Sequence, residues 1–398
     1  MRPIGIALVV AVVVAHAHTA FADPVKRVDL GDGLTLSIEG GKLVVRKGKQ
    51  WAPLGLGLEI DDVKLDRKHR TVDFTLDDGQ CPGFRGQSWK LDALAARAEN
   101  ASAYLLHVKK DFKAAADGYA RAIALDGSWD IPAYNLAGAL TSLHDLDGAT
   151  KALASRMKDA PYATYAQVAT DPELAPLLAR PEVRVVLASK PGTAQLASGL
   201  ARQPEVLYSA ERGLVAVDFS EGTAEQCGYH ESYVLHELAT DRVVAILPVV
   251  LDGDFAAQVC GDPSAVALSA AGKAAVGKRS ANVQAILVAL GFSPTTIEKS
   301  PDGTIDGNSG DADTKWKVYF EKSKIGVVVK SRVGYFRSGA IHVLRGNTSL
   351  GTGTGAYAKL AASLFLVDLD AVVVNTYEPG MSTCGIDPHR AANVIKLK

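Results

Sequence analysis

An acidic segment, DGTIDGNSGDAD at residues 302–313, has the residue types and spacing of a calcium-binding loop. Oxygen-bearing side chains stand at loop positions 1, 3, 5 and 12, and Gly307 stands where such a loop bends. The candidate calcium ligands are Asp302, Thr304, Asp306 and Asp313. Position 8 is Ser309 rather than an apolar residue, and position 12 is Asp rather than a bidentate Glu. A solvated acidic turn is therefore the favoured interpretation, with calcium as the alternative.

Thiol and imidazole groups offer a second kind of metal site. Cys227, His230 and His236 have the residue types that bind zinc, but no further Cys or His pair nearby completes four ligands. The glycine-rich GNTSLGTGTGAY at residues 346–357 lacks the Gly-Lys-Ser/Thr ending of a phosphate-binding loop, so we expect a flexible loop there. The sequence predicts no cofactor.

Groups that could catalyse hydrolysis gather near the end of the chain. The segment 374–389 combines a phenol, a carboxylate, a hydroxyl, a thiol and an imidazole: Tyr377, Glu378, Ser382, Cys384 and His389. A hidden active site would be expected there, although a disulfide-anchored surface loop is the simpler interpretation. No Gly-x-Ser-x-Gly elbow occurs in the chain.

The first 22 residues have the pattern of a secretory signal peptide. Arg2 precedes an apolar run from Ile4 to Ala15, and Ala20-Phe21-Ala22 offers small residues for cleavage. The run is shorter than the roughly 20 residues that a membrane-spanning helix needs. We therefore expect cleavage near Ala22 and a mature periplasmic or secreted protein without a transmembrane segment.

Export changes the expected chemistry of the cysteines, because an oxidising compartment favours disulfides. The chain has four of them: Cys81, Cys227, Cys260 and Cys384. The shortest loop closes when Cys227 pairs with Cys260, and such a bridge stabilises a fold by on the order of 3–4 kcal/mol. The other two are then free or join the two ends of the chain.

Length and composition bound the architecture. A chain of 398 residues predicts two or three domains, and its 47% hydrophobic content is that of a globular protein. The formal net charge of -1, from 43 basic and 44 acidic residues, gives no reason to expect nucleic acid as a partner.

The hydrophobic periodicity predicts an α+β multidomain protein. Alternation around Gly40-Gly41 indicates an antiparallel β unit over residues 23–87, and the period becomes helical from Ser88. A Gly- and Pro-containing linker at 191–205 follows the helical segment 88–190. Residues 206–398 read as a β-rich meander with one helix, which we expect to begin after Ser280 and to end at Gly291.

Within the helical segment the chain repeats itself at a fixed offset. DFKAAADGYARAIALD at 111–126 recurs in part as DLDGATKALASRMKDA at 145–160, so Asp111 meets Asp145 and Ala115 meets Ala149. This period, with Leu136-Ala137 and Pro161 at the expected places, resembles the tetratricopeptide repeat family over about residues 96–161. The first helix of the first copy departs from the pattern, with Glu99 and Ser102 where large apolar residues are usual.

The resemblance implies that the first helix of each pair lines a groove for a protein or peptide. The corresponding positions are Asn100, Tyr104, His107, Tyr134, Asn135, Gly138 and Thr141. Asn135 matches the family's peptide-binding asparagine, whereas the lysines of its carboxylate clamp are absent, which weakens the case for a C-terminal peptide ligand.

The resemblance thus implies a binding or scaffold protein of the bacterial envelope. Two alternatives stay open: a structural envelope protein whose groove is filled by its own chain, and a hydrolase-like or calcium-dependent enzyme in the C-terminal region.

Overall fold

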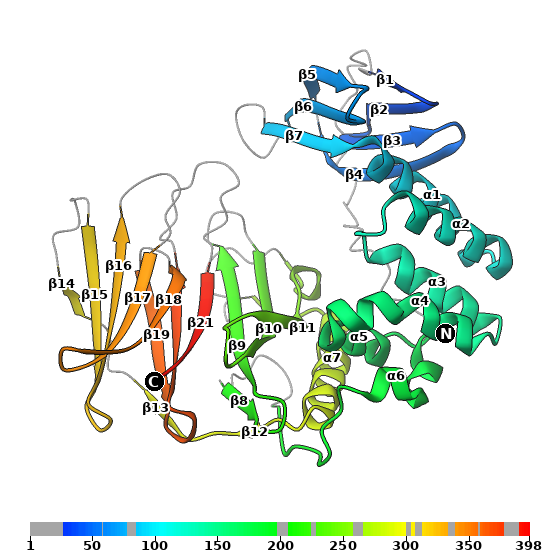
Figure 1. The fold of residues 1–398 in the computed structure, drawn as a ribbon. Helices are drawn as coiled ribbons and strands as arrows, with labels where there is room; N and C mark the ends of the chain where they lie inside the picture. Colours follow the sequence, from blue (N-terminus) through cyan, green and yellow to red (C-terminus); the bar gives the residue numbers. More distant parts are fainter. Residues whose placement is uncertain are drawn as a thin grey trace. The chain divides into compact units, whose positions relative to one another are not determined.

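The described part of the chain combines helices with small antiparallel sheets, which makes it an α+β protein (Figure 1). The computed structural model describes residues 27–57, 59–77, 85–196, 206–223, 228–257, 266–299, 304–306, 313–332, 339–356, 359–377 and 390–398. These residues divide into two compact units. The first contains the described residues up to 159 together with 167–184, and the second contains 160–166 and the described residues from 185 onward.

The first unit begins with two antiparallel sheets. One sheet, in the order β1-β2-β3-β4, consists of β1 (Arg27–Gly31), β2 (Leu34–Glu39), β3 (Lys42–Lys47) and β4 (Gln50–Leu56). The other consists of β5 (Glu59–Asp66), β6 (Thr71–Asp77) and β7 (Arg85–Lys90). The predicted hairpin at Gly40-Gly41 is confirmed: both glycines have positive φ, 57° and 73°, as a tight two-residue turn requires.

Helix α1 (Leu91–Val108) completes the core of these sheets. Leu91, Leu94 and Ala98 are buried in the same cluster as Val72 and Phe74 of β6. The predicted onset of helix at Ser88 is wrong, because residues 88–90 pair with β6 as the end of β7 and the helix begins at Leu91. The strand continues because its apolar Trp89 packs against the sheet core.

The rest of the first unit is helical. After α1 the chain forms α2 (Phe112–Leu125), α3 (Ile131–Ser142), α4 (Leu146–Asp159), η1 (Ala175–Ala179) and α6 (Pro181–Arg184). Helix α5 (Pro161–Thr170) connects α4 with the segment before η1. Helix α2 packs against α1, α3 packs against α2, and α4 packs against α3 (Figure 1).

The backbone of the first unit repeats itself at the offset found in the sequence. The turns after α1 and α3 each contain one residue with positive φ, Lys110 at 65° and His144 at 63°. The next residue, Asp111 or Asp145, donates its N–H to the carbonyl five residues earlier, at 3.0 Å and 2.9 Å. Its carboxylate then accepts the N–H three residues later and caps the following helix. Two helix pairs with one turn geometry therefore follow each other at the interval that separates Asp111 from Asp145.

The second unit contains three antiparallel sheets and α7 (Ala270–Ala289). The first sheet, in the order β11-β10-β9-β8-β12, is formed by β8 (Val206–Ser209), β9 (Leu214–Thr223), β10 (Gly228–Glu237), β11 (Val243–Val250) and β12 (Ser293–Pro294). The second, in the order β13-β19-β20-β21, is formed by β13 (Ile297–Lys299), β19 (Lys359–Leu366), β20 (Ala371–Tyr377) and β21 (Arg390–Lys396). The third runs in sequence order through β14 (Thr304–Asp306), β15 (Asp313–Phe320), β16 (Ile325–Arg332), β17 (Gly339–Arg345) and β18 (Thr348–Ala356).

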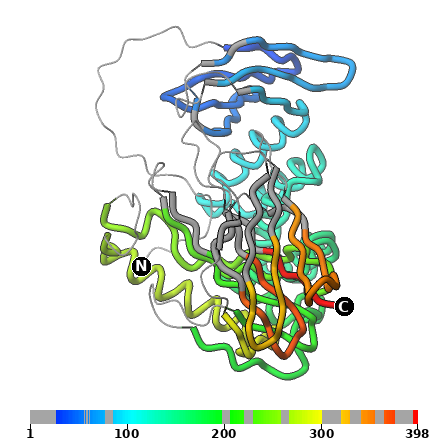
Figure 2. The backbone as a smooth tube through the Cα atoms, turned by 90° about the vertical axis from the view of Figure 1, so that its left-hand side faces the viewer, coloured from blue at the N-terminus to red at the C-terminus, as the bar shows by residue number. Residues whose placement is uncertain are grey.

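The four-stranded sheet of this unit is buried on both faces. Along β20, Val372 and Val374 belong to the core shared with the β14–β18 sheet. The alternate residues Ala371 and Val373 belong to the core shared with the β8–β12 sheet. Because successive side chains of a strand point to opposite faces, this sheet is the middle layer of three, which explains its continuous apolar sequence. Figure 2 shows the backbone of these sheets in a view turned by 90° from that of Figure 1.

Two predictions for the second unit are wrong. Helix α7 starts not after Ser280 but after Ser269, whose hydroxyl caps it by accepting the N–H of Gly272 at 2.9 Å. Ser280 is buried within the helix, while the predicted end is confirmed by Gly291 with a φ of 83°. The glycine-rich segment expected as a flexible loop forms β18, because the small residues let this strand approach β21 closely.

Candidate functional site

The seven predicted groove residues lie on α1 and α3, the first helices of the two pairs. Asn100 and Asn135 contact each other directly: the Asn135 side-chain amide donates to the Asn100 side-chain oxygen at 3.0 Å. Asn100 is buried and Asn135 is half-buried. The amide pair therefore joins α1 to α3 on the face where the resemblance places a ligand.

At the other end of this face, His107 is enclosed by polar and aromatic groups. Its Nε2 lies 3.1 Å from a carboxylate oxygen of Glu173, and its Nδ1 lies 3.3 Å from the hydroxyl of Tyr119. The Phe112 ring meets the imidazole edge-on, with centroids 5.1 Å apart. A β-carbon at Gly138 would lie only 3.1 Å from the same glutamate oxygen, so the absence of a side chain there leaves room for Glu173.

The electrostatics of this end follow from burial and from the imidazole. Contact with the His107 imidazole holds the pKa of Glu173 below its ordinary value. Burial and the neighbouring Glu173 charge raise the pKa of Asp171. Burial also raises the pKa of the Tyr119 hydroxyl. The surroundings of His107 therefore favour one ionised carboxylate, and Glu173 of the same chain supplies it.

The remaining positions of the face differ in accessibility. Tyr104 is 37% exposed, whereas Thr141 is buried and donates its hydroxyl to the carbonyl of Ala137 in its own helix at 2.8 Å. Tyr134 is half-buried and makes interactions of its own. The face is therefore accessible at Tyr104 and covered by Glu173 at Gly138.

The departure from the repeat pattern at Glu99 has a structural explanation. Glu99 is buried, and its carboxylate accepts hydrogen bonds from Gln50 at 3.0 Å and Arg121 at 3.2 Å. Lys47 adds an ion pair at 3.8 Å. A polar residue replaces an apolar one here because α1 packs on β3 and β4 as well as on α2, and these supply its partners.

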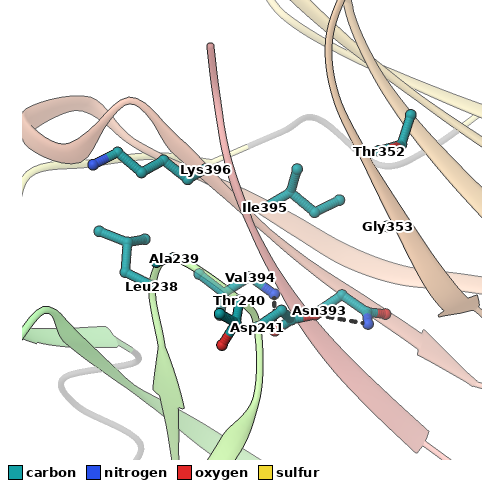
Figure 3. Close-up of a pocket in the computed structure, with 10 residues that line it drawn as sticks. All are labelled: Leu238, Ala239, Thr240, Asp241, Thr352, Gly353, Asn393, Val394, Ile395 and Lys396. Atoms are coloured by element: carbon teal, nitrogen blue, oxygen red, sulfur yellow. Dashed lines mark hydrogen bonds between the residues drawn. The ribbon is translucent and has the colours of Figure 1, made fainter.

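The second unit contains a polar cavity of about 430 Å³ (Figure 3). Its lining comes from the β10–β11 turn, from β18 and from β21: Leu238, Ala239, Thr240, Asp241, Thr352, Gly353, Asn393, Val394, Ile395 and Lys396. This volume lies within the range of roughly 300–1,000 Å³ in which proteins bind small ligands. This site is not visible in the sequence, because its three segments are far apart in the chain.

Asp241 organises the wall of this cavity. One carboxylate oxygen accepts the Nδ1–H of His236 at 2.8 Å and the backbone N–H of Val394 at 2.7 Å. The other accepts the side-chain amide of Asn393 at 3.0 Å, as drawn in Figure 3. Asp241 has a φ of 59°, in the left-handed region that Asp adopts more readily than most other non-glycine residues.

The arrangement of His236 and Asp241 is the reverse of a hydrolytic dyad. In a hydrolase the carboxylate is buried and orients an imidazole whose outer nitrogen faces the substrate. Here the His236 side chain is only 2% exposed and Asp241 is the member that lines the cavity. The geometry supports binding at Asp241 rather than general-base catalysis by His236.

The candidate zinc ligands are not brought together by the described residues. His230 pairs with Asp252 at 2.9 Å, His236 pairs with Asp241, and Cys227 lies outside the described residues. No group of three or more His, Cys, Asp or Glu side chains within the described ranges is placed to hold a metal ion.

The candidate calcium segment contains the short strand β14 and the first residue of β15. Thr304 and Asp306 belong to β14 and Asp313 begins β15, which pairs with β14 in antiparallel register. Asp302 lies outside the described residues, as do all four cysteines of the disulfide predictions and residues 378–389 of the candidate hydrolase segment. Tyr377 of that segment ends β20.

Comparison with known proteins finds no matching family profile, no matching curated protein and no matching solved structure. Among the helices that the structure describes, none has both the length and the apolar character needed to cross a bilayer.

Proposed function

We propose that this protein is an exported scaffold that binds a protein or peptide through tetratricopeptide-like repeats. The binding surface is the face of α1 and α3 that carries Asn100, Tyr104, Tyr134 and Asn135. Export through the N-terminal signal sequence places it in the periplasm or outside the cell.

The observation that carries this proposal is the repeated helix–turn–helix backbone. Lys110 and His144 adopt the same left-handed conformation one repeat apart, and Asp111 and Asp145 make the same two capping contacts. A period of about 34 residues with two helices per unit is the geometry of this repeat class. Repeats of this kind use the exposed face of their first helices as an extended binding surface.

The polar groups on this face suit an extended peptide. A carboxamide has two N–H donors and one carbonyl acceptor, so Asn135 can donate to Asn100 and also contact a peptide backbone. Tyr104 adds an aromatic surface that is 37% exposed. Aromatic residues are enriched at protein interfaces because they bury a large apolar area at low entropic cost.

The test uses the full mature chain. A partner recovered from an envelope extract is purified, and its binding to the scaffold is measured directly. Replacing Tyr134 and Asn135 together with alanine should weaken binding by about tenfold or more, since both lie at the centre of the proposed surface. The matched control is Lys151→Ala on the exposed side of α4, which should bind like the wild type. Equal binding by both variants would refute the proposed surface.

A second candidate function is favoured by the contact between Glu173 and His107. If the face is filled by the chain itself, the protein has a structural role and the contact only stabilises the fold. Glu173→Ala discriminates between the two. A scaffold should bind its partner at least as well after this change, whereas a structural protein should show lower stability and no binding in either form.

A further inference from the structure

The cavity in the second unit runs along the outer edge of a strand. Four consecutive residues of β21, Asn393 to Lys396, line it, and β21 is the last strand of the sheet β13-β19-β20-β21. The turn residues Thr240 and Asp241 stand on one side, and Thr352 and Gly353 of β18 stand on the other (Figure 3). The cavity is therefore a slot beside a strand edge.

The orientation of the β21 backbone follows from its contacts. The N–H of Val394 donates to Asp241, so it points away from β20. Lys396 lies two residues further along the same strand and stands opposite Ala371 of β20. In an antiparallel pair this alternation gives Lys396 the same orientation, with its N–H and C=O directed outward. The C=O faces Gly351 of β18, where a β-carbon would lie 3.2 Å from it, so the N–H of Lys396 is the group left for a peptide. Beyond the slot, the N–H of Lys398 donates to the carbonyl of Leu350 at 2.9 Å and closes the edge.

The Asp241 carboxylate at the wall of this slot pairs with the His236 imidazole but, among the described residues, with no lysine or arginine. The contacts of Asp241 come from an imidazole, a carboxamide and a backbone N–H. Within the described part of the chain, no lysine or arginine forms an ion pair with Asp241, and the ammonium group of Lys396 points away from it in Figure 3. The Asp241 side chain is 25% exposed. A partly exposed carboxylate at a cavity wall can accept a further, charge-assisted hydrogen bond, so a cationic ligand group suits this position.

We propose that this slot binds a short extended peptide segment that pairs with the outer edge of β21 and places a lysine or arginine side chain against Asp241. The backbone hydrogen bonds to β21 supply affinity, as in other cases of strand addition. The carboxylate supplies specificity for a basic residue. A guanidinium can bond to Oδ2 of Asp241, the oxygen that accepts the hydrogen bond from Asn393 and can accept a second one. Leu350 and Asp241 close the two ends, so the segment is short.

The test is isothermal titration of the full mature chain with three capped tripeptides: acetyl-Val-Arg-Val-amide, acetyl-Val-Gln-Val-amide and acetyl-Val-Glu-Val-amide. The arginine peptide should bind about tenfold more tightly than the glutamine peptide, which lacks the charged hydrogen bond. The glutamate peptide should bind most weakly. Equal affinities for the three peptides, or heats too small to measure for all of them, would overturn the proposal.

Two variants place the binding in the slot. Asp241→Asn should reduce the affinity for the arginine peptide to that for the glutamine peptide. Thr352→Lys, on the exposed rim, should block the slot and weaken binding of all three peptides. Its matched control is Thr348→Lys, which adds the same charge to an exposed position of β18 outside the lining and should bind like the wild type.

If Asp241→Asn fails to fold, the binding measured with Thr352→Lys still tests whether the peptides occupy the slot. Unchanged binding by Thr352→Lys, or equal loss by Thr348→Lys, would refute the slot as the site. This site and the α1–α3 face belong to different units and are tested with different variants, so one can fail while the other stands.

Discussion

Asp241→Ala should lower the stability of the second unit by about 4 kcal/mol. The substitution leaves three donors without their acceptor: His236 Nδ1, Asn393 Nδ2 and the N–H of Val394. Each costs about 1 kcal/mol, at the low end of the range for buried groups because the cavity lets water approach. Alanine in the left-handed backbone region, at a φ of 59°, adds about 1 kcal/mol.

Asp241→Asn is the comparison that isolates the hydrogen bonds from the charge. Asparagine tolerates the same backbone conformation, and its oxygen can accept both His236 and Val394. The Asn393 amide can rotate so that its oxygen accepts from the new NH₂ group. We expect a loss of about 1 kcal/mol or less for this variant.

Scanning calorimetry measures the difference. For a unit of this size each kcal/mol shifts the melting temperature by about 2–4 °C, so Asp241→Ala should melt about 8–16 °C below the wild type. Thr240→Ser, in the same turn and exposed, keeps the hydroxyl that bonds Glu237 and Arg242 and should stay within about 0.5 kcal/mol. If the stability of Asp241→Ala stays within about 1 kcal/mol of the wild type, these contacts do not hold β21 against the β10–β11 turn and the reasoning is wrong.

Two further predictions concern a helix and a pH dependence. In α7, Gly272→Ala should destabilise the protein by about 1–3 kcal/mol, because a β-carbon would overlap the Asp254 carbonyl oxygen. Gly277→Ala should stabilise it by about 1 kcal/mol, because nothing lies within 4 Å of its β-carbon position. Melting temperatures that shift in the same direction for the two variants would contradict this. Because contact with His107 lowers the pKa of Glu173, the stability it provides is fully present above the ordinary glutamate pKa and is lost as the pH falls through the lowered one. The difference in urea midpoint between wild type and Glu173→Gln should therefore be largest near neutral pH and vanish in acid, and a difference that does not change with pH would refute the assignment.

Local patterns predicted the α+β class and the first hairpin. The turn at Gly40-Gly41 needed residues that tolerate positive φ between alternating strands, and that requirement is visible in the sequence. The start of α7 was not predicted, because the Ala- and Gly-rich turns after Ser269 carry few large apolar side chains. They are helical since the serine cap and packing against β11 outweigh the low propensity of glycine.

The candidate sites were predictable only where they followed a repeat. The repeat offset placed Asn100 and Asn135 on one face, and the structure brings them within 3.0 Å of each other. Nothing in the sequence indicated that Glu173 would cover His107, because a single glutamate after a proline carries no periodic signal. The Asp241 cluster was missed for a similar reason: Asn393 lies 152 residues away and only the fold brings the two together.

The glycines of β18 show most clearly why a local interpretation failed. Alternating glycines in a sequence suggest a phosphate-binding turn or a flexible loop, and both explanations treat glycine as a source of backbone freedom. In the structure the reason is lack of volume: a β-carbon at Gly351 or Gly353 would lie 2.8 Å or 2.9 Å from the Ile395 side chain. The same absence of side chains lets β18 pass close to β21 and leaves the slot open beside it, since Gly353 is part of the lining. The pattern therefore encodes both a close strand contact and the proposed peptide site, and both depend on β21, the third strand after β18 along the chain.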